Sequence, residues 1–254
     1  MAVQRALWRP YFEAFPPWPC PTCGGVGKLV VIKDALKVEE TGPSRSEHGQ
    51  EYWDPEHIQK RFSGLFRCNN DRCGEVVSAT GNTDLIEVYY YDENGIPDSD
   101  YNERYWPLSL NPAPHIFDIP EKCPETASKA ITAGFALFWI DRDACGSKWR
   151  LAIEELLTEL GISRFRKRVK GRPLQTRPLQ DRINSFKLKN PEAGECLEAV
   201  KWLGNHGTHA GSGLKDDDIL KAAEILEHAL DLIYVDRQGP IKAARKINKK
   251  KGPA

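Results

Sequence analysis

The chain has 254 residues, of which 40% are hydrophobic and 28% charged, and this is the composition of a globular protein with a buried core. Its 36 basic and 36 acidic side chains cancel, so the total charge neither favours nor excludes a nucleic-acid partner. No stretch approaches the roughly 20 consecutive apolar residues of a membrane helix. There is no apolar signal-peptide core near the N-terminus, and the seven cysteines, an odd number, favour a reducing compartment. We therefore expect a cytoplasmic protein that does not contact membranes.

The charge is distributed unevenly along the chain. Residues 1–140 carry 13 Lys/Arg against 20 Asp/Glu, whereas residues 141–254 carry 23 against 16. Net charges of −7 and +7 predict two parts with different roles.

The N-terminal third is predicted to be irregular at first and then rich in strands. Residues 1–19 combine aromatic side chains with prolines, which suits a segment packed onto another surface. β-Branched runs bounded by turn residues then predict strands. These predicted strands cover residues 27–40, 64–67, 76–79 and 84–91, with a polar inserted loop at 40–60. A turn-rich stretch then precedes residues 101–110, and a proline-spaced linker follows at 110–120.

From residue 124 onward the pattern becomes helical. Apolar side chains recur at helical spacing, and capping residues flank several of the runs. The predicted helices cover residues 124–144, 145–161, 178–187, 194–204 and 216–234. Five helices joined by loops predict a bundle.

Two cysteine pairs carry the strongest chemical signal in the sequence. Cys20 and Cys23 form one pair, Cys68 and Cys73 the other, and glycine follows each pair directly. Four thiolates can surround Zn²⁺ as a tetrahedron, and a glycine with positive φ lets backbone N–H groups point at the sulfurs. Predicted strands beside both pairs fit a zinc ribbon, in which the ion replaces part of a core.

Four thiolates close the coordination sphere, so the sequence predicts structural rather than catalytic zinc. Two alternatives stay open, namely four thiols without metal and a redox role for the first pair. If zinc is structural, chelation is expected to unfold about the first hundred residues and leave the helices intact. The remaining cysteines are predicted to be lone thiols: Cys123, Cys145 and Cys196.

A glycine-rich run, GNHGTHAG, follows the fourth predicted helix. One interpretation is structural, with Gly204 and Asn205 capping the helix and His209 bonded to backbone. The other is a polar site that combines Asn205, His206 and His209 with Arg150. The sequence leaves both interpretations open.

Several runs in the second half occur in a characteristic order: PHIFDIP, WRLAIEEL, PLQDRI, VKWLGNHGTHAG and DDDILKAAEILEHALDLIY. Within them, Arg150 precedes Glu154 by one helical turn, and Asn205 precedes His209 by four residues. On these motifs, residues 105–236 resemble the bacterial family catalogued as domain of unknown function 4145. This helical domain is placed in the HEPN superfamily and is often attached to restriction-system subunits.

The resemblance implies a HEPN-like helical bundle and suggests chemistry on RNA. Many relatives in the superfamily resemble metal-independent ribonucleases, in which an arginine and a histidine a few residues apart act across a helical dimer. A histidine can take the proton of a 2′-OH while a cation stabilises charge on the phosphate. Counting back from His209 finds no arginine, and counting back from His206 reaches Lys201, which lacks the bidentate guanidinium fork. The motif is therefore degenerate, and endoribonuclease activity stays an open question.

A basic stretch separates the third and fourth predicted helices. Residues 164–189 hold ten Lys/Arg and one Asp, and the tail adds further lysines. Such a density of cations suits a phosphate backbone, and RNA is expected more than DNA. A solvated loop with no partner is the alternative.

Together these features predict an α+β protein in three parts. A zinc-ribbon-like antiparallel β module covers residues 1–104, a HEPN-like α-helical bundle covers 105–236, and a basic tail covers 237–254. The predicted function is RNA binding in a defence or restriction setting, with His209 as acid/base, Asn205 positioning the substrate, and Lys201 or Arg150 as the cation. A homodimer and a protein partner from the same defence system are compatible with it. The rival hypothesis is a non-catalytic protein–protein interaction module.

Overall fold

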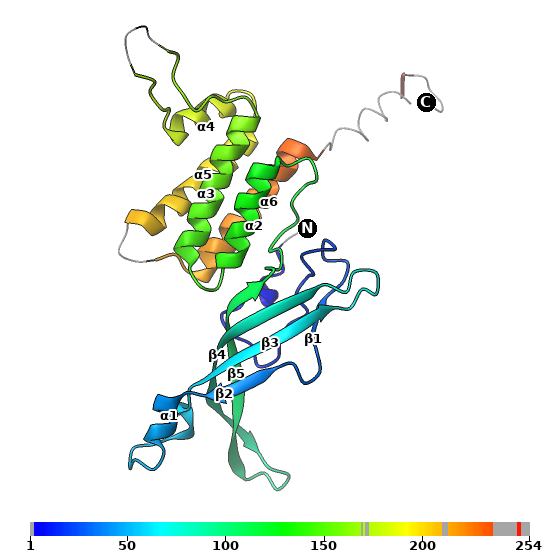
Figure 1. The fold of residues 1–254 in the computed structure, drawn as a ribbon, viewed down its shortest axis with the longest axis vertical. Helices are drawn as coiled ribbons and strands as arrows, with labels where there is room; N and C mark the ends of the chain where they lie inside the picture. Colours follow the sequence, from blue (N-terminus) through cyan, green and yellow to red (C-terminus); the bar gives the residue numbers. More distant parts are fainter. Residues whose placement is uncertain (1–2, 169, 171–172, 210–212, 236–247, 250–254) are drawn as a thin grey trace.

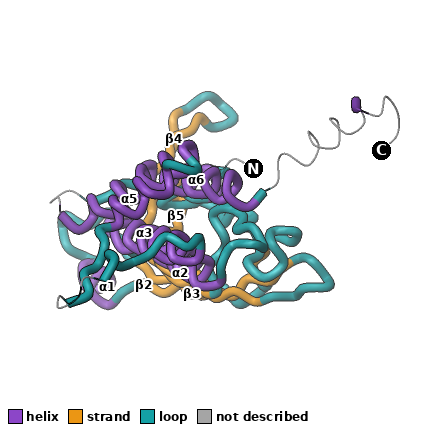
Figure 2. The backbone as a smooth tube through the Cα atoms, turned by 90° about the horizontal axis from the view of Figure 1, so that it is seen from above, coloured by secondary structure: helices purple, strands orange, loops and turns teal. Residues whose placement is uncertain are grey.

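An antiparallel sheet lies at one end of the molecule and a group of helices at the other (Figure 1). The structure is a computed structural model that describes residues 3–168, 170, 173–209, 213–235 and 248–249, apart from the side chains of 206–209. Viewed down the long axis, the helices overlie the strands (Figure 2). The predicted α+β class, with the sheet first and the helices second, is confirmed.

The sheet contains five antiparallel strands in the order β1-β3-β4-β5, with β2 pairing with the first half of β3. The bounds are β1 (Leu29–Val31), β2 (Lys37–Glu40), β3 (Lys60–Cys68), β4 (Val76–Tyr91) and β5 (Pro97–Asn111). Along β3, Phe62, Phe66 and Cys68 alternate with exposed residues, because successive side chains of a strand point to opposite faces. One face of the sheet is thereby buried.

Two strand predictions differ from the structure. The single strand expected over 27–40 is two short strands, because the chain turns at Asp34, which has a φ of 65°. The strands expected at 76–79 and 84–91 are one long strand, β4. Its register shifts at Thr80/Gly81, where β3, β4 and β5 still lie side by side.

The polar segment 40–60, expected to be a loop, contains two short helices. They are α1 (Gly42–Glu47) and the 3-10 helix η2 (Pro55–His57). Thr41 accepts the N–H of Ser44, and Asp54 accepts the N–H of Glu56, so both helices start with a side-chain cap. These cap signals are present in the sequence, although the helices they open are only three to six residues long.

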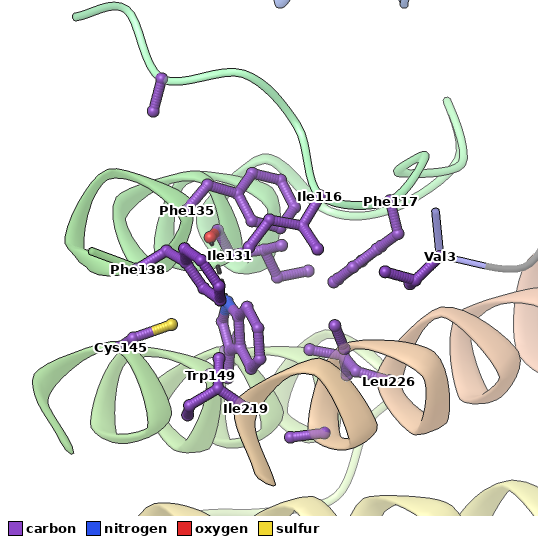
Figure 3. Packing of buried hydrophobic residues seen from close by; sticks show 14 of the residues in the cluster. Val3, Ile116, Phe117, Ile131, Phe135, Phe138, Cys145, Trp149, Ile219 and Leu226 are labelled. Carbon is purple, nitrogen blue, oxygen red and sulfur yellow. Dashed lines mark hydrogen bonds between the residues drawn. The ribbon is translucent and has the colours of Figure 1, made fainter. Parts of the chain in front are cut away.

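Five helices are present, as predicted, but the run expected at 124–144 is interrupted: one helix ends at Leu137, and the next begins at Arg142 after its cap, Asp141. The five helices are α2 (Glu125–Leu137), α3 (Arg142–Glu159), α4 (Leu179–Lys187), α5 (Pro191–His209) and α6 (Asp216–Tyr234). At their centre, Trp149 is fully buried beside Phe135, and its indole N–H donates to the Ile131 carbonyl at 3.2 Å (Figure 3). This hydrogen bond satisfies the indole N–H, which would otherwise be a buried donor without a partner.

Helix α5 does not end at Gly204, as the structural interpretation of the glycine-rich run expected, but continues to His209. A Cβ on Gly204 would lie 2.6 Å from the Gly146 carbonyl oxygen of α3 and 2.9 Å from the Arg150 Cβ. The glycine therefore allows close approach of two helices rather than a C-terminal turn. The capping role for Gly204 and Asn205 is wrong.

The N-terminal segment connects the sheet to the helices. Trp8 packs on Phe138, with ring centroids 5.9 Å apart, and on Trp139 at 5.5 Å. Trp18 contacts Phe66 of the sheet at 5.8 Å and Trp139 at 5.6 Å. One continuous cluster of buried side chains consequently extends through both halves.

The part boundaries stay predictions. The sheet extends to Asn111, so the division placed at residues 104/105 falls inside β5. Nearly all of the predicted basic tail lies outside the described residues.

Candidate metal centre

Two chain turns bring the four predicted zinc ligands together. The first turn is closed by Cys20 N–H donating to the Gly27 carbonyl at 3.0 Å, and it leads into β1. The second joins β3 to β4, where Cys68 N–H donates to the Glu75 carbonyl at 2.8 Å. Because β1 pairs with β3 so that Leu29 faces Cys68, the two turns meet at one edge of the sheet.

The sulfur positions fit a tetrahedral ion. Cys20 Sγ lies 3.8 Å from Cys73 Sγ, and Cys23 Sγ lies 3.7 Å from Cys68 Sγ. All four sulfurs lie within 4.8 Å of one another. A tetrahedron with Zn–S bonds of about 2.3 Å has S···S edges of about 3.8 Å. The donor set and its spacing therefore fit Zn²⁺.

The backbone around the sulfurs also suits thiolates. Gly27 N–H donates to Cys23 Sγ at 3.2 Å, and Asn70 N–H donates to Cys68 Sγ at 3.5 Å. Such bonds stabilise negative sulfur and orient the ligand. Gly24 and Gly74, with φ of 59° and 63°, adopt the positive φ predicted for them. Nothing in the sequence singled out Gly27, yet a Cβ there would collide with Cys68 Sγ.

The surroundings of Cys20, Cys23 and Cys68 change the acidity of these thiols. Burial raises the pKa of Cys20 to about 12 and also raises the pKa of Cys68. The Gly27 N–H holds the pKa of Cys23 at about 7. Thiolates at the buried positions need a nearby positive charge, which a divalent ion supplies, so metal binding here would release protons.

The other cysteines are not part of this cluster. Cys123 and Cys145 are buried and Cys196 is half-buried. Burial raises the pKa of Cys123 to about 11, which makes a reactive thiolate rare. These positions agree with lone structural thiols.

The polar residues predicted on the helices are only partly brought together. Arg150 on α3 forms an ion pair with Glu154 at 3.0 Å. Burial lowers the pKa of Lys201 on α5, and the positive charge of Arg150 lowers it by a smaller amount. Lys201 is only 3% exposed, and its ammonium group donates to the Gln180 side chain and lies over the Trp202 ring. Its contacts are therefore within the protein.

Asn205 lies one helical turn after Lys201 and is half-buried. The backbone of His206 and His209 forms the last turns of α5, and their side chains lie outside the described residues. The predicted catalytic roles of Arg150, Lys201, Asn205 and these histidines stay predictions.

The basic stretch has two distinct parts. Arg182 on α4 is buried and donates to the Glu154 and Ile162 carbonyls and to Thr158, so it holds helices together. The described residues 163–168, 170 and 173–177, called the basic loop, project beyond α4 (Figure 1). Arg166 N–H donates to the Gln175 carbonyl at 2.9 Å, which makes the base of this loop a narrow hairpin.

The basic loop presents cations around an aromatic ring. Phe165 is 44% exposed, and Arg166, Lys167, Arg168 and Lys170 are exposed with it. A hollow of about 450 Å³ is lined by Ser163, Phe165, Arg166, Lys167 and Arg177. The positive charge of this segment could be predicted from the sequence, whereas the exposed aromatic ring within it was not predicted.

The fold and the cysteine cluster define an α+β protein with a candidate four-cysteine metal centre at the edge of its sheet. Residues 132–250 match the family model described as Domain of unknown function (DUF4145), as the sequence motifs predicted. Residues 11–109 match a second model, Domain of unknown function (DUF8608). No curated protein and no solved structure matches the chain. Within the described residues, no helix is both long and apolar enough to cross a membrane.

Proposed function

We propose that this protein binds RNA through the basic loop, in a bacterial defence or restriction setting. The observation that carries the proposal is the exposed Phe165 ring, which lines one hollow with Arg166 and Lys167, while Arg168 and Lys170 are exposed farther along the loop. Cations track a phosphate backbone, and an aromatic ring stacks on an unpaired base. This combination favours a single strand, because duplex bases are already stacked on one another.

Charge pairing within the protein leaves these cations available. Arg164 forms an ion pair with Glu155, while Arg166 approaches Asp181 only at 3.8 Å. Among the described residues, no ion pair engages Lys167, Arg168 or Lys170. The cations beyond the base of the hairpin therefore face solvent.

The setting rests on the family match and on the predicted HEPN-like nature of the helices. The DUF4145 match covers α3 to α6, and the motifs that carry the resemblance lie on or beside them, except PHIFDIP, which precedes α2. Zinc at the four cysteines would hold the sheet and supply no chemistry, since four thiolates leave no open position.

Metal-independent RNA cleavage is the second candidate. It is favoured by Arg150 and Asn205, which lie on helices that meet at Gly146 and Gly204. In this proposal His209 or His206 takes the 2′-OH proton and Arg150 stabilises the phosphate. Arg150 suits the role of cation better than Lys201, because its side chain is 38% exposed and Lys201 is buried.

The binding proposal predicts a separate effect for charge and for stacking. With a fluorescent single-stranded RNA, changing Arg166 and Lys167 to alanine should reduce the slope of log affinity against log salt by about 0.7 per lost contact. Phe165→Ala should cost about 1–3 kcal/mol with little change in slope. Fluorescence anisotropy at several salt concentrations measures both. The matched control changes the exposed Lys122 and Lys221 to alanine. Equal losses in control and loop variants would refute the basic loop as the site.

The cleavage candidate predicts that labelled RNA is cut by the native protein and not by His209→Ala. The buffer should be stripped of free metal beforehand and contain no chelator, because a chelator would also attack the cysteine centre. Intact RNA after incubation with micromolar native protein would eliminate the ribonuclease and leave the binding proposal standing.

A further inference from the structure

The far halves of β4 and β5 form a two-stranded ribbon that extends beyond the rest of the sheet (Figure 1). The pairing of β3 with β4 stops at Lys60 and Thr83, so residues 85–103 pair only with each other. Asp92 shapes the turn by accepting the N–H groups of Asn94 and Ile96, and Gly95 has a φ of 77°. These residues, 85–103, are called the acidic ribbon below.

The acidic ribbon carries negative charge and aromatic rings together. It contains six carboxylates and no Lys or Arg. These are Glu87, Asp92, Glu93, Asp98, Asp100 and Glu103. Of these six carboxylates, only Glu103 forms an ion pair with a described residue, namely Lys60 at 3.0 Å. Five carboxylates therefore lack a described cationic partner.

Three consecutive tyrosines occupy the outer part of the ribbon. Tyr89, Tyr90 and Tyr91 are 78%, 45% and 75% exposed. The carboxylates of Glu87 and Asp98 accept the hydroxyls of Tyr89 and Tyr90 and raise the pKa of both. A hairpin outside the sheet gains little stability from such rings, because it has no core in which to bury them. Exposed rings amid unpaired acids are typical of a surface that receives cations.

The basic loop offers the complementary surface in the same chain. It presents Arg166, Lys167, Arg168 and Lys170, four cations against five unpaired carboxylates. The basic loop and the acidic ribbon lie at opposite ends of the long axis of the molecule (Figure 1). They therefore cannot meet within one copy.

We propose that the acidic ribbon docks the basic loop of a second copy of this chain. In an antiparallel pair related by a two-fold axis across the long axis, each ribbon reaches the loop of its partner, so both contacts form at once and the assembly closes. Arginines of the loop can then pair with carboxylates and stack on the tyrosines. RNA would compete for the same loop, whereas the acidic ribbon repels it.

Sedimentation velocity of the full chain tests this inference. We expect a dimer at about 50 mM NaCl that dissociates at about 500 mM, since salt at that level screens exposed charges within a few ångströms. Changing Asp98 and Asp100 to lysine should weaken association roughly tenfold or more, and so should changing Arg166 and Lys167 to glutamate. A mixture of these two variants should restore the dimer, because in the mixed pair both ribbon–loop contacts again join opposite charges.

The matched control changes Glu13 and Glu121, exposed acids outside the ribbon, to lysine, which alters the net charge equally. The control should dimerise like the native chain. A monomer at low salt, equal dissociation of the control, or a mixture that stays monomeric would overturn the inference. RNA binding by the Asp98→Asn, Asp100→Asn variant is expected to persist, so loss of the dimer and loss of the proposed function are separate results.

Discussion

Replacing Cys68 with serine is expected to abolish stoichiometric zinc binding and to destabilise the sheet. The native chain should hold about one zinc ion, and the variant almost none, because a hydroxyl is a poor substitute for the thiolate in a four-sulfur site. Structural zinc contributes about 10–16 kcal/mol of apparent binding free energy in small zinc modules, which is comparable to the whole stability of a domain. Elemental analysis of purified protein and thermal unfolding followed by circular dichroism measure the two effects.

Cys196→Ser is the matched control, because this thiol is half-buried on α5 and lies outside the sulfur cluster. It should retain zinc and lower the unfolding temperature only slightly. If Cys68→Ser binds as much zinc as the control, the four cysteines are not the ligands. If it loses zinc without any loss of stability, the ion has no structural role.

Zinc removal is expected to destabilise the helices as well as the sheet. The sequence alone had suggested that the helices would stay intact. Cys20 is the second residue after Trp18, and Leu29 N–H donates to the Trp18 carbonyl at 2.9 Å in the same turn. Trp18 in turn packs on Trp139 just beyond α2. Loss of the first zinc turn therefore frees a ring that covers the helical core.

The sequence was most informative where short-range chemistry decides the structure. The clustering of the four cysteines could be predicted because thiol pairs followed by glycine are typical of a metal site. The five helices could be predicted because their apolar periodicity is long and capping residues flank several of them. Each cysteine pair and each of these helices spans fewer than twenty residues.

The features that could not be predicted depend on contacts distant in sequence. Gly204 suggested a helix end, and only the approach of Gly146 on α3 shows why a glycine is needed inside α5. Lys201 or Arg150 was expected to be the cation at a phosphate, and the sequence did not indicate that Gln180 of α4 would accept a hydrogen bond from the Lys201 ammonium group. The aromatic N-terminal segment was expected to pack on some surface, and the surface proved to be the junction of the sheet with the helices.

Trp18→Ala is expected to be the most damaging substitution outside the four-cysteine cluster. The side chain is fully buried, it contacts rings from the N-terminal segment, the sheet and the helices, and its indole N–H donates to the Leu7 carbonyl at 2.8 Å. Removing a buried tryptophan costs about 3–5 kcal/mol, a large share of the roughly 5–15 kcal/mol by which domains are stable. Urea unfolding followed by circular dichroism gives the loss directly.

Trp202→Ala provides the matched comparison, since Trp202 is 59% exposed and its loss, with the contact of its ring to Lys201, should cost only about 0.5–1 kcal/mol. A second measurement separates two roles of Trp18, namely filling the core and holding the turn that carries Cys20. Because its backbone closes the turn that carries Cys20, Trp18→Ala should also speed release of zinc to a coloured chelator, whereas Trp202→Ala should not. A Trp18→Ala variant that is destabilised but releases zinc at the native rate would mean that the metal turn holds its shape independently of the shared core.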